Sequence, residues 1–239
     1  MFNLIYEQSN DSHTILMKDG IDCVYHDKES DKNNLAKIES LTFGSLALKK
    51  LLSDYCFDTV LDIGCGEGIH TNIFREYGKV VTSVDLNPGI QDAIKADYNT
   101  NVFEPHDCIW CCHVLEHQLN VNLFLKKVHR ELKEGGILAV SVPPLKHAIV
   151  GGHVTLWNGG LLMYNLVLAG FDCSCISIKK YGYNISVILK KKTIELPDGL
   201  HYDNGDLEKL HEFFPAFVHQ AFNGDIEEYN WDGLSNIDV

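Results

Sequence analysis

Two histidines and a glutamate stand close together near the middle of the chain. His113, Glu116 and His117 have the spacing H-x-x-E-H, which supplies two metal ligands and a catalytic glutamate in some zinc peptidases. Such a site needs both histidines on one face of a helix, yet His113 falls in CIWCCHV (108–114), an apolar run typical of a buried strand. A zinc site also needs a third ligand, and none stands at a useful spacing. We therefore expect no metal, and a zinc-dependent hydrolase is kept only as an alternative.

A glycine-rich turn is the second candidate site. Gly64, Gly66 and Gly68 follow the apolar run of VLDIGCGEG (60–68) and come just before a predicted helix. Glycine lets a backbone approach a ligand closely, and a helix start places free N–H groups beside it. The dinucleotide fingerprint G-x-G-x-x-G needs its third glycine where this chain has Ile69. A nicotinamide oxidoreductase is therefore disfavoured, and no phosphate-loop G-K-[ST] is present.

Acidic residues stand at the ends of the next two predicted strands. Asp85 ends the strand of KVVTSVDLN (79–87), where a carboxylate can accept two hydrogen bonds from ribose hydroxyls. Asp97 ends the strand of DAIKADY (92–98), a position that suits the exocyclic amine of an adenine. Ligands of doubly wound sheets collect at the carboxyl ends of the strands, so these acids and the glycine turn are expected on one rim.

Strands and helices alternate along the part of the chain that carries these residues. This alternation predicts an α/β, doubly wound, Rossmann-like and mostly parallel sheet with helices on both faces. Residues 172–192 form two alternating runs around Lys180-Tyr181-Gly182 and predict an antiparallel C-terminal hairpin at one edge. Residues 59–68 are predicted to be a strand that runs into a tight loop. The other predicted strands cover 79–87, 92–98, 106–114 and 137–144, and the predicted helices cover 37–55, 70–78, 120–136 and 159–171. DLNPG lies so close to the next strand that the helix usually found there is short or absent.

Three regions follow from composition. Residues 1–36 are polar and mixed and are expected to be an N-terminal extension or a cap over a site. Residues 37–192 are the predicted catalytic domain. Residues 193–239 are acidic and aromatic and are short for a domain, so we expect a C-terminal extension packed on the domain rather than an independent module.

The order of these motifs resembles the class I S-adenosylmethionine-dependent methyltransferases, over residues 37–192. The matching residues are Asp62, Gly64, Gly66 and Gly68, then Asp85, then Asp97, then DCIWCCHVLEH (107–117). The resemblance implies S-adenosyl-L-methionine as cofactor, S-adenosyl-L-homocysteine as product and direct transfer of a methyl group to a small-molecule substrate. A protein that binds the cofactor without catalysis stays a second alternative.

The resemblance also implies roles for single residues. The loop of Asp62, Gly64, Cys65 and Gly66 would curl around the methionine part of the cofactor. Asp85 would hold the ribose and Asp97 would reach the adenine. The residues expected to line the base are Leu86, Asn87 and Tyr98. His113 would touch the methionyl end of the cofactor and is also a candidate catalytic residue.

The acceptor side is expected at the same rim, in SVPPLKHAIVGGHVTLWNGG (141–160), because loops at such rims tend to carry function. His117 or His153 is the candidate base for a hydroxyl acceptor. The candidate substrate-binding residues are His147, His153, Trp157 and Asn158, although His153 could instead cap a helix and Trp157 could pack in the core. Residues 151–173 resemble methyltransferases of bacterial capsule and surface-polysaccharide synthesis, which implies a sugar, nucleotide-linked or phosphoramidate acceptor.

The whole-chain properties exclude some partners. A net charge of −13 repels phosphate backbones, so no nucleic acid is expected. The first residues, MFNLIYEQSND, have no basic region and no long apolar run, so we expect no membrane span and a cytoplasmic protein. Its eight cysteines are therefore expected to be thiols. Cys108 and Cys111 should point to opposite faces of a strand, and the oligomeric state stays open.

Overall fold

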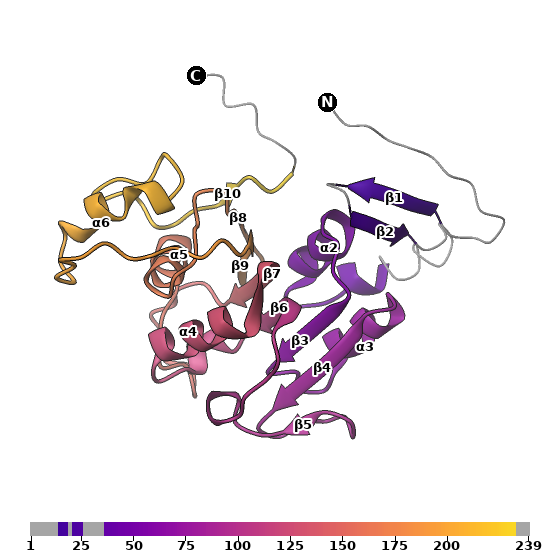
Figure 1. Cartoon of the computed structure of the whole chain (residues 1–239). Helices are drawn as coiled ribbons and strands as arrows, with labels where there is room; N and C mark the ends of the chain where they lie inside the picture. The colour runs from indigo at the N-terminus through magenta and orange to yellow at the C-terminus, as the bar shows by residue number, and fades with distance from the viewer. Residues whose placement is uncertain (1–13, 19–20, 26–35, 233–239) are drawn as a thin grey trace.

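The computed structural model describes residues 14–18, 21–25 and 36–232 (Figure 1). Strands β1 (Thr14–Lys18) and β2 (Ile21–Tyr25) pair with each other as a small antiparallel sheet. The rest of the predicted N-terminal extension, and the last seven residues of the predicted C-terminal extension, lie outside the described residues.

A sheet of eight strands forms the centre of the fold, in the order β10-β8-β9-β7-β6-β3-β4-β5. Its parallel part contains β3 (Thr59–Ile63), β4 (Val80–Asp85), β5 (Ile94–Lys95), β6 (His106–Cys112) and β7 (Leu132–Val142). The antiparallel part contains β8 (Ser177–Tyr181), β9 (Asn184–Lys190) and β10 (Glu228–Tyr229), and β9 joins it to β7. The predicted mostly parallel sheet with an antiparallel hairpin at one edge is confirmed.

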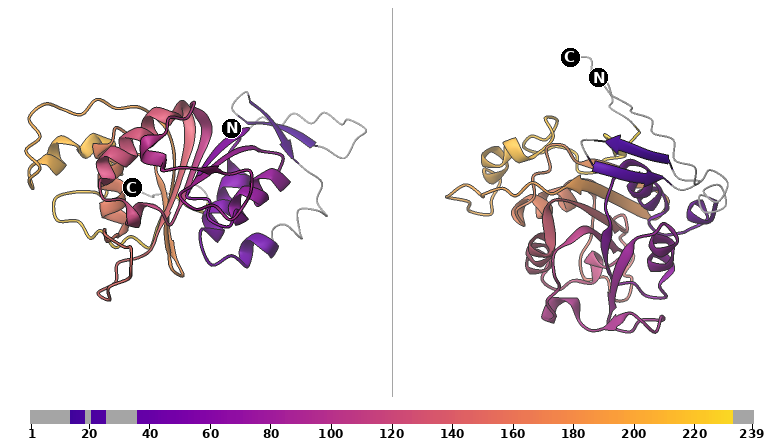
Figure 2. Two further views of the ribbon diagram at one scale, coloured as in Figure 1. Left: turned by 90° about the horizontal axis from the view of Figure 1, so that it is seen from below. Right: turned by 45° about the vertical axis from the view of Figure 1, so that its right-hand side comes forward.

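Helices cover both faces of this sheet, as the view from below shows (Figure 2). On one side lie α2 (Ser45–Asp54) and α3 (Ile69–Glu76), and on the other lie α4 (Val121–Glu131) and α5 (Gly159–Leu168). Strand β6 explains this arrangement, because successive side chains of a strand point to opposite faces of the sheet. Ile109 lies in the same core as Phe124 of α4, and Trp110 lies in the same core as Leu48 of α2. No helix in the described part of the chain is long and apolar enough to cross a membrane.

Two predicted helices have different bounds in the structure. The helix predicted over 37–55 has its main body from Ser45, because Gly44 adopts a left-handed φ of 67° immediately before it. The helix predicted over 120–136 ends at Glu131, and β7 begins at the next residue. Lys191 donates to the backbone oxygens of His129 and Leu132, at 2.7 and 2.8 Å, and so satisfies carbonyl groups at this helix end. Residues 86–93 form no helix, as predicted.

The described part of the C-terminal extension is packed into the fold. It contains the short helices α6 (Asp206–Lys209) and η3 (His211–Phe213), and β10 pairs with β8. Leu210, Phe214 and Ile226 are buried in the core on the α5 side, and Trp231 packs on the other side of the sheet. These residues therefore share the hydrophobic cores of the sheet.

The cysteines mostly behave as core residues. Cys108 belongs to the core on the α2 side and Cys111 to the core on the α4 side, and both are free thiols. The prediction that they face opposite sides of a strand is confirmed. Cys56 is disulfide-bonded, so the expectation of eight thiols is wrong for that residue.

A buried polar contact joins β3 to the helix that follows it. Asp62 is 1% exposed, and its carboxylate accepts a hydrogen bond from the Thr71 hydroxyl of α3 at 2.5 Å. The same hydroxyl lies 2.9 Å from Ser83 Oγ on β4. Burial raises the pKa of the Asp62 carboxyl to about 6. The contact fixes α3 against two neighbouring strands and leaves a carboxyl that ionises with difficulty.

Replacing Asp62 with asparagine should change how stability depends on pH. Between the ordinary pKa of 3.8 and the folded pKa of about 6, the folded state holds a proton that the unfolded state has lost. The contribution of Asp62 to the stability of the wild-type protein should therefore fall as the pH rises through this range, by roughly 3 kcal/mol. Asparagine still accepts from Thr71 but cannot ionise, so Asp62→Asn should lack this change. Urea unfolding at about pH 4.5 and about pH 7 measures it.

Asp107→Asn provides the matched control. Partial burial raises the pKa of Asp107, but hydrogen bonds from Lys133 and Thr59 outweigh it and hold the pKa at about 2. The stabilisation from Asp107 is thus present above the ordinary pKa and is lost in acid, which is the opposite sign. Equal pH profiles for the wild-type protein and Asp62→Asn would contradict the assignment.

Candidate active site

The glycine turn after β3 adopts a backbone that side chains disfavour. Gly64, Gly66 and Gly68 have φ values of 72°, 50° and 73°, in the left-handed region that favours glycine. A Cβ on Gly64 would lie 2.3 Å from Val114, and a Cβ on Gly68 would lie 2.6 Å from Ile90. A Cβ on Gly66 would meet no atom of the described residues within 4 Å. Gly64 and Gly68 are therefore required by packing, whereas the space over Gly66 is open to a ligand.

Asp85 lies beside this turn at the carboxyl end of β4. One carboxylate oxygen accepts from the Gly66 N–H at 3.0 Å, and the other accepts from the Asn87 N–H at 2.7 Å. Leu86 is 69% exposed, and Asn87 accepts a hydrogen bond from Lys95 at 3.2 Å. The structure thus brings Asp85, Gly66, Leu86 and Asn87 together on one rim, as expected.

Asp62 and Cys65 lie beneath that rim. Asp62 is directed to Thr71, and Cys65 is 7% exposed. Burial raises the pKa of the Cys65 thiol to about 12, so the group stays protonated near neutral pH. Both residues support the turn from the protein side.

The side chains of Asp97 and Tyr98 lie in different environments. Asp97 is exposed and accepts hydrogen bonds from the backbone and side-chain nitrogens of Asn99, at the start of the short helix η1 (Tyr98–Thr100). Tyr98 is 5% exposed, and its ring packs against Phe124 and Phe103. The ring also lies under the Lys127 ammonium. Tyr98 is therefore placed in the interior and not along the rim, which differs from the prediction that it lines a ligand.

His113 is held firmly just after β6. It has a positive φ of 56°, which is uncommon for a residue with a side chain. Its Nε2 lies 3.0 Å from Asn184 Oδ1, and its ring packs on Phe43 with centroids 4.4 Å apart. Tyr183 lies nearby, with ring centroids 5.9 Å apart. Contacts from two separate segments therefore fix the orientation of this imidazole.

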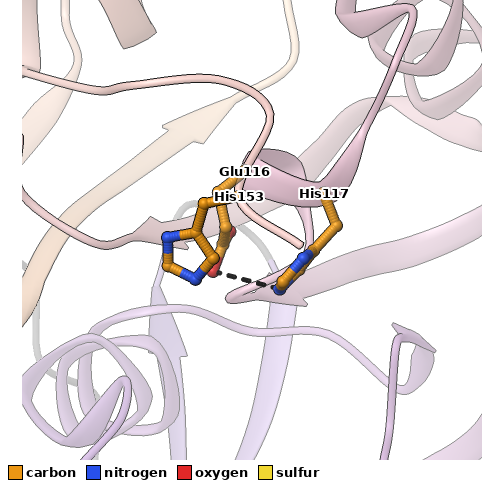
Figure 3. Close-up of side chains that lie close together, drawn as sticks. All are labelled: Glu116, His117 and His153. Carbon is orange, nitrogen blue, oxygen red and sulfur yellow. Dashed lines mark ion pairs between the residues drawn. The ribbon is translucent and has the colours of Figure 1, made fainter. Parts of the chain in front are cut away.

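The loop after β7 brings His153 next to the H-x-x-E-H segment, as Figure 3 shows. Glu116 and His117 belong to the short helix η2 (Leu115–His117), and the rings of His117 and His153 lie at 87° with centroids 5.0 Å apart. The backbone oxygen of Glu116 accepts from the N–H groups of Val154 and Thr155, at 2.8 and 3.3 Å. These hydrogen bonds join the two segments directly.

A small cavity of about 180 Å³ adjoins these histidines. His147 and His153 line it together with Lys146, Trp157 and Tyr183. Trp157 is 3% exposed, and its indole nitrogen has no hydrogen-bond partner among the residues that the structure describes. The structure therefore gathers three of the four predicted substrate-binding residues around one space.

Asn158 lies elsewhere. Its side chain accepts from the Leu161 N–H at 2.8 Å and so caps the start of α5. It lines a second, more open cavity of about 430 Å³ between α5 and the C-terminal extension, together with Tyr164, Tyr202 and Phe222. Asn158 is therefore placed apart from His147 and His153, contrary to their predicted grouping.

Sequence reasoning left out several residues that shape the site. Phe43 comes from the segment before α2, and Tyr183 and Asn184 come from the β8–β9 hairpin. The hairpin itself was predicted, but no local pattern indicates that its turn reaches the end of β6. The H-x-x-E-H spacing was the only local pattern that pointed to this part of the site, because a glutamate between two histidines suggests that the three residues act together.

Comparisons with known proteins agree with this geometry. The family model for a methyltransferase domain matches residues 32–166. A ubiquinone biosynthesis O-methyltransferase of Xylella fastidiosa (strain 9a5c) is 32% identical over an alignment of 99 residues, and the match covers 34% of this chain and 40% of that protein. One from Bartonella quintana is 31% identical over 98 residues, with the same two coverages. The chain thus spans 40% of the length of these curated relatives.

Solved structures share the fold. An S-adenosylmethionine-dependent methyltransferase from Archaeoglobus fulgidus matches with a TM-score of 0.51 and 17% identity, over 69% of this chain and 100% of that one. Human N-acetylserotonin methyltransferase, in complex with S-adenosylmethionine, matches with a TM-score of 0.50 and 17% identity, over 68% and 57% of the two chains. The family model spans more than half of the sequence, on the elements that form the glycine turn, the acidic rim and the histidine segment, and the chain therefore belongs to the methyltransferase-domain family.

Proposed function

We propose that this protein is an S-adenosyl-L-methionine-dependent methyltransferase that transfers a methyl group to an oxygen of a small acceptor. One observation carries the proposal. Within the stretch that matches the methyltransferase family, the backbone at Gly66 faces open space, and the Asp85 carboxylate lies directly beside it.

The residues present fit this cofactor. Each Asp85 oxygen accepts one backbone hydrogen bond, and a carboxylate has about four acceptor sites, so two remain for the hydroxyls of a ribose. The space over Gly66 allows the methionyl part to cross the turn at close range. Exposed Leu86 offers an apolar surface to the base, and Asp97 offers an exposed carboxylate for the adenine amine.

The protein's task in such a reaction is placement. When bound, S-adenosylmethionine supplies a methyl group already activated by its positively charged sulfur. The chain must then hold the acceptor oxygen in line with that methyl group and exclude water. His113, fixed by Asn184 and Phe43, provides a rigid wall next to Val114, which packs under Gly64.

The acceptor would enter the cavity lined by His147, His153, Lys146, Trp157 and Tyr183. Its volume is below the range of about 300 to 1,000 Å³ usual for ligand pockets, which suits one end of a small molecule. His153 lines this cavity and His117 packs against His153, so their ring nitrogens are the candidate groups to take a proton from a hydroxyl acceptor.

The acceptor class is proposed from two resemblances. The 151–173 segment, similar to that of surface-polysaccharide methyltransferases, favours an oxygen of a sugar, nucleotide-linked or phosphoramidate intermediate. The relatives named as ubiquinone biosynthesis O-methyltransferases support transfer to oxygen and make an intermediate of that biosynthesis the second candidate.

Replacing Gly66 with alanine should weaken binding of S-adenosyl-L-homocysteine with little loss of stability. The added methyl group meets no atom in the part of the chain that the structure describes, so the folded state bears only the left-handed strain, about 1 kcal/mol. A ligand crossing the turn would meet that methyl group, and affinity should fall by more than about tenfold. Calorimetric titration measures the affinity, and thermal unfolding measures the strain.

Gly199→Ala controls for the strain alone. Gly199 also has a left-handed φ, 76°, with nothing within 4 Å of an added Cβ. It should show a similar loss of stability and unchanged binding. Equal affinity of Gly66→Ala and Gly199→Ala would place the cofactor elsewhere.

Replacing Asp85 with alanine should weaken the same binding by more than about tenfold, because hydrogen bonds to charged groups are worth roughly 1.5 to 3 kcal/mol. Asp92→Ala is the control, since Asp92 is an exposed acid between β4 and β5 that pairs with Arg75 at 2.7 Å. Calorimetry should show near wild-type affinity for Asp92→Ala. Unchanged affinity in Asp85→Ala would remove the ribose assignment.

Turnover identifies the acceptor and separates an enzyme from a protein that only binds the cofactor. Nucleotide sugars, phosphoramidates and ubiquinone-pathway intermediates would be incubated with S-adenosylmethionine, and mass spectrometry would detect products heavier by one CH₂. We expect product from at least one oxygen acceptor, and less product with His153→Asn. Tight cofactor binding without turnover across the panel would favour the non-catalytic alternative.

A further inference from the structure

The Glu116 carboxylate is buried without adequate partners. The residue is 1% exposed, and its Oε2 has no hydrogen-bond partner in the described part of the chain. Its Oε1 lies 3.3 Å from His113 Nδ1 and 3.7 Å from His117 Nε2. No lysine or arginine among the described residues pairs with it. A buried carboxylate in this state is costly unless a positive charge compensates it.

The hydrogen bonds of His117 determine which of its nitrogens faces Glu116 as an acceptor. Its Nδ1 lies 2.8 Å from the backbone oxygen of Gly152, and because a carbonyl only accepts, Nδ1 carries the hydrogen. In the neutral ring Nε2 then presents a lone pair, and it points at a carboxylate oxygen. Two acceptors facing each other at 3.7 Å repel unless a cation lies between them.

His113 repeats this arrangement. Asn184 Oδ1 accepts from the Gly44 N–H, and the Asn184 amide nitrogen donates to the Thr42 oxygen, so the oxygen of this amide faces His113. His113 Nε2 therefore donates to Asn184, which leaves the lone pair of Nδ1 directed at Glu116. The carboxylate is thus approached by acceptor nitrogens from two sides.

His153 completes a group of three ligand atoms. One atom each from Glu116, His117 and His153 lie within 4.8 Å of one another, and Figure 3 shows them turned toward a common centre. Ligands of a tetrahedral zinc ion, bound at 2.0–2.2 Å, are about 3.4 Å apart, close to the 3.7 Å between Glu116 and His117. A metal-bound histidine usually donates its other N–H to a carbonyl or carboxylate, as His117 does to Gly152.

We propose that Glu116, His117 and His153 bind one divalent transition-metal ion at the wall of the acceptor cavity. Two imidazoles with one carboxylate suit Zn²⁺, Fe²⁺ or Co²⁺ better than Mg²⁺ or Ca²⁺, which prefer oxygen ligands. Three protein ligands leave a coordination position open, and His153 lines the cavity, so an acceptor oxygen can take that position. This acceptor role rests on the proposed function.

The proposal changes two expectations. The sequence predicted no metal because no third ligand stands near Glu116 and His117 along the chain. In the structure, the loop after β7 supplies that ligand, His153. His117 and His153 would hold the ion through their lone pairs and so could not accept a proton. The ion would instead make a bound hydroxyl more acidic, and the proton of that hydroxyl would pass to solvent water. A hydrolase does not follow, because the site lies beside the glycine turn of a methyltransferase fold.

Metal binding can be measured without activity. Untagged protein would be treated with a chelator, dialysed and titrated with Zn²⁺ or Co²⁺ by calorimetry, with the metal content of the purified protein measured by mass spectrometry. We expect one ion per chain. Glu116→Gln and His153→Asn should each weaken binding by more than about tenfold, the scale on which metal sites respond to loss of a supporting group. His147→Asn, in the same cavity wall but outside the group, should bind the ion as the wild-type protein does.

Titration of the same samples with S-adenosyl-L-homocysteine separates the two proposals. Protein that binds this nucleoside but takes up no ion would overturn the metal site and leave the methyltransferase function standing. Uptake of the ion without binding of S-adenosyl-L-homocysteine would support the metal site and overturn the proposed methyltransferase function. Equal metal affinity in Glu116→Gln and the wild-type protein would remove Glu116 from the ligand set and overturn the proposed site.

Discussion

The turn between β3 and α3 is the constraint on which the rest of the site depends. The N–H groups of Gly64 and Cys65 both donate to the backbone oxygen of Val84, which ties the turn to the end of β4. Asp85, the next residue, accepts from Gly66. These hydrogen bonds therefore hold the turn and the acid together before the start of α3, and glycine favours the left-handed backbone that the turn requires.

A second junction orients the acceptor side. Asn184, the first residue of β9, contacts His113 after β6, and its side chain also bonds the backbone of Thr42 and Gly44 before α2. One buried amide thus joins three segments that are far apart in the sequence. The unusual backbone of His113 is accounted for by these contacts, because they hold the residue in place against its intrinsic preference.

Sequence patterns predicted what depends on periodicity and order. The apolar strands, the glycine turn and the acid at the end of β4 are local signals, and the sheet rule places their ends together. Prediction was less successful where residues distant in the sequence determine a helix end, the burial of a side chain or the composition of the site. Lys191 contributes to ending α4 five residues early, and Phe103, Phe124 and Lys127 enclose Tyr98. His153 meets Glu116 only because the loop after β7 folds back, which no spacing along the chain reveals.

The C-terminal segment has a consequence for the edge of the sheet. An exposed strand edge offers unpaired backbone groups to other chains, and β10 covers part of that edge on β8. The lysines of β8 are matched by acids in β10 and on either side of it: Lys180 pairs with Asp225 and Glu227, and Lys179 pairs with Glu228 and Asp232. These acidic residues thus balance the lysines of β8 where β10 covers part of the sheet edge, and a chain shortened before β10 would expose unpaired backbone groups and uncompensated lysines to its neighbours.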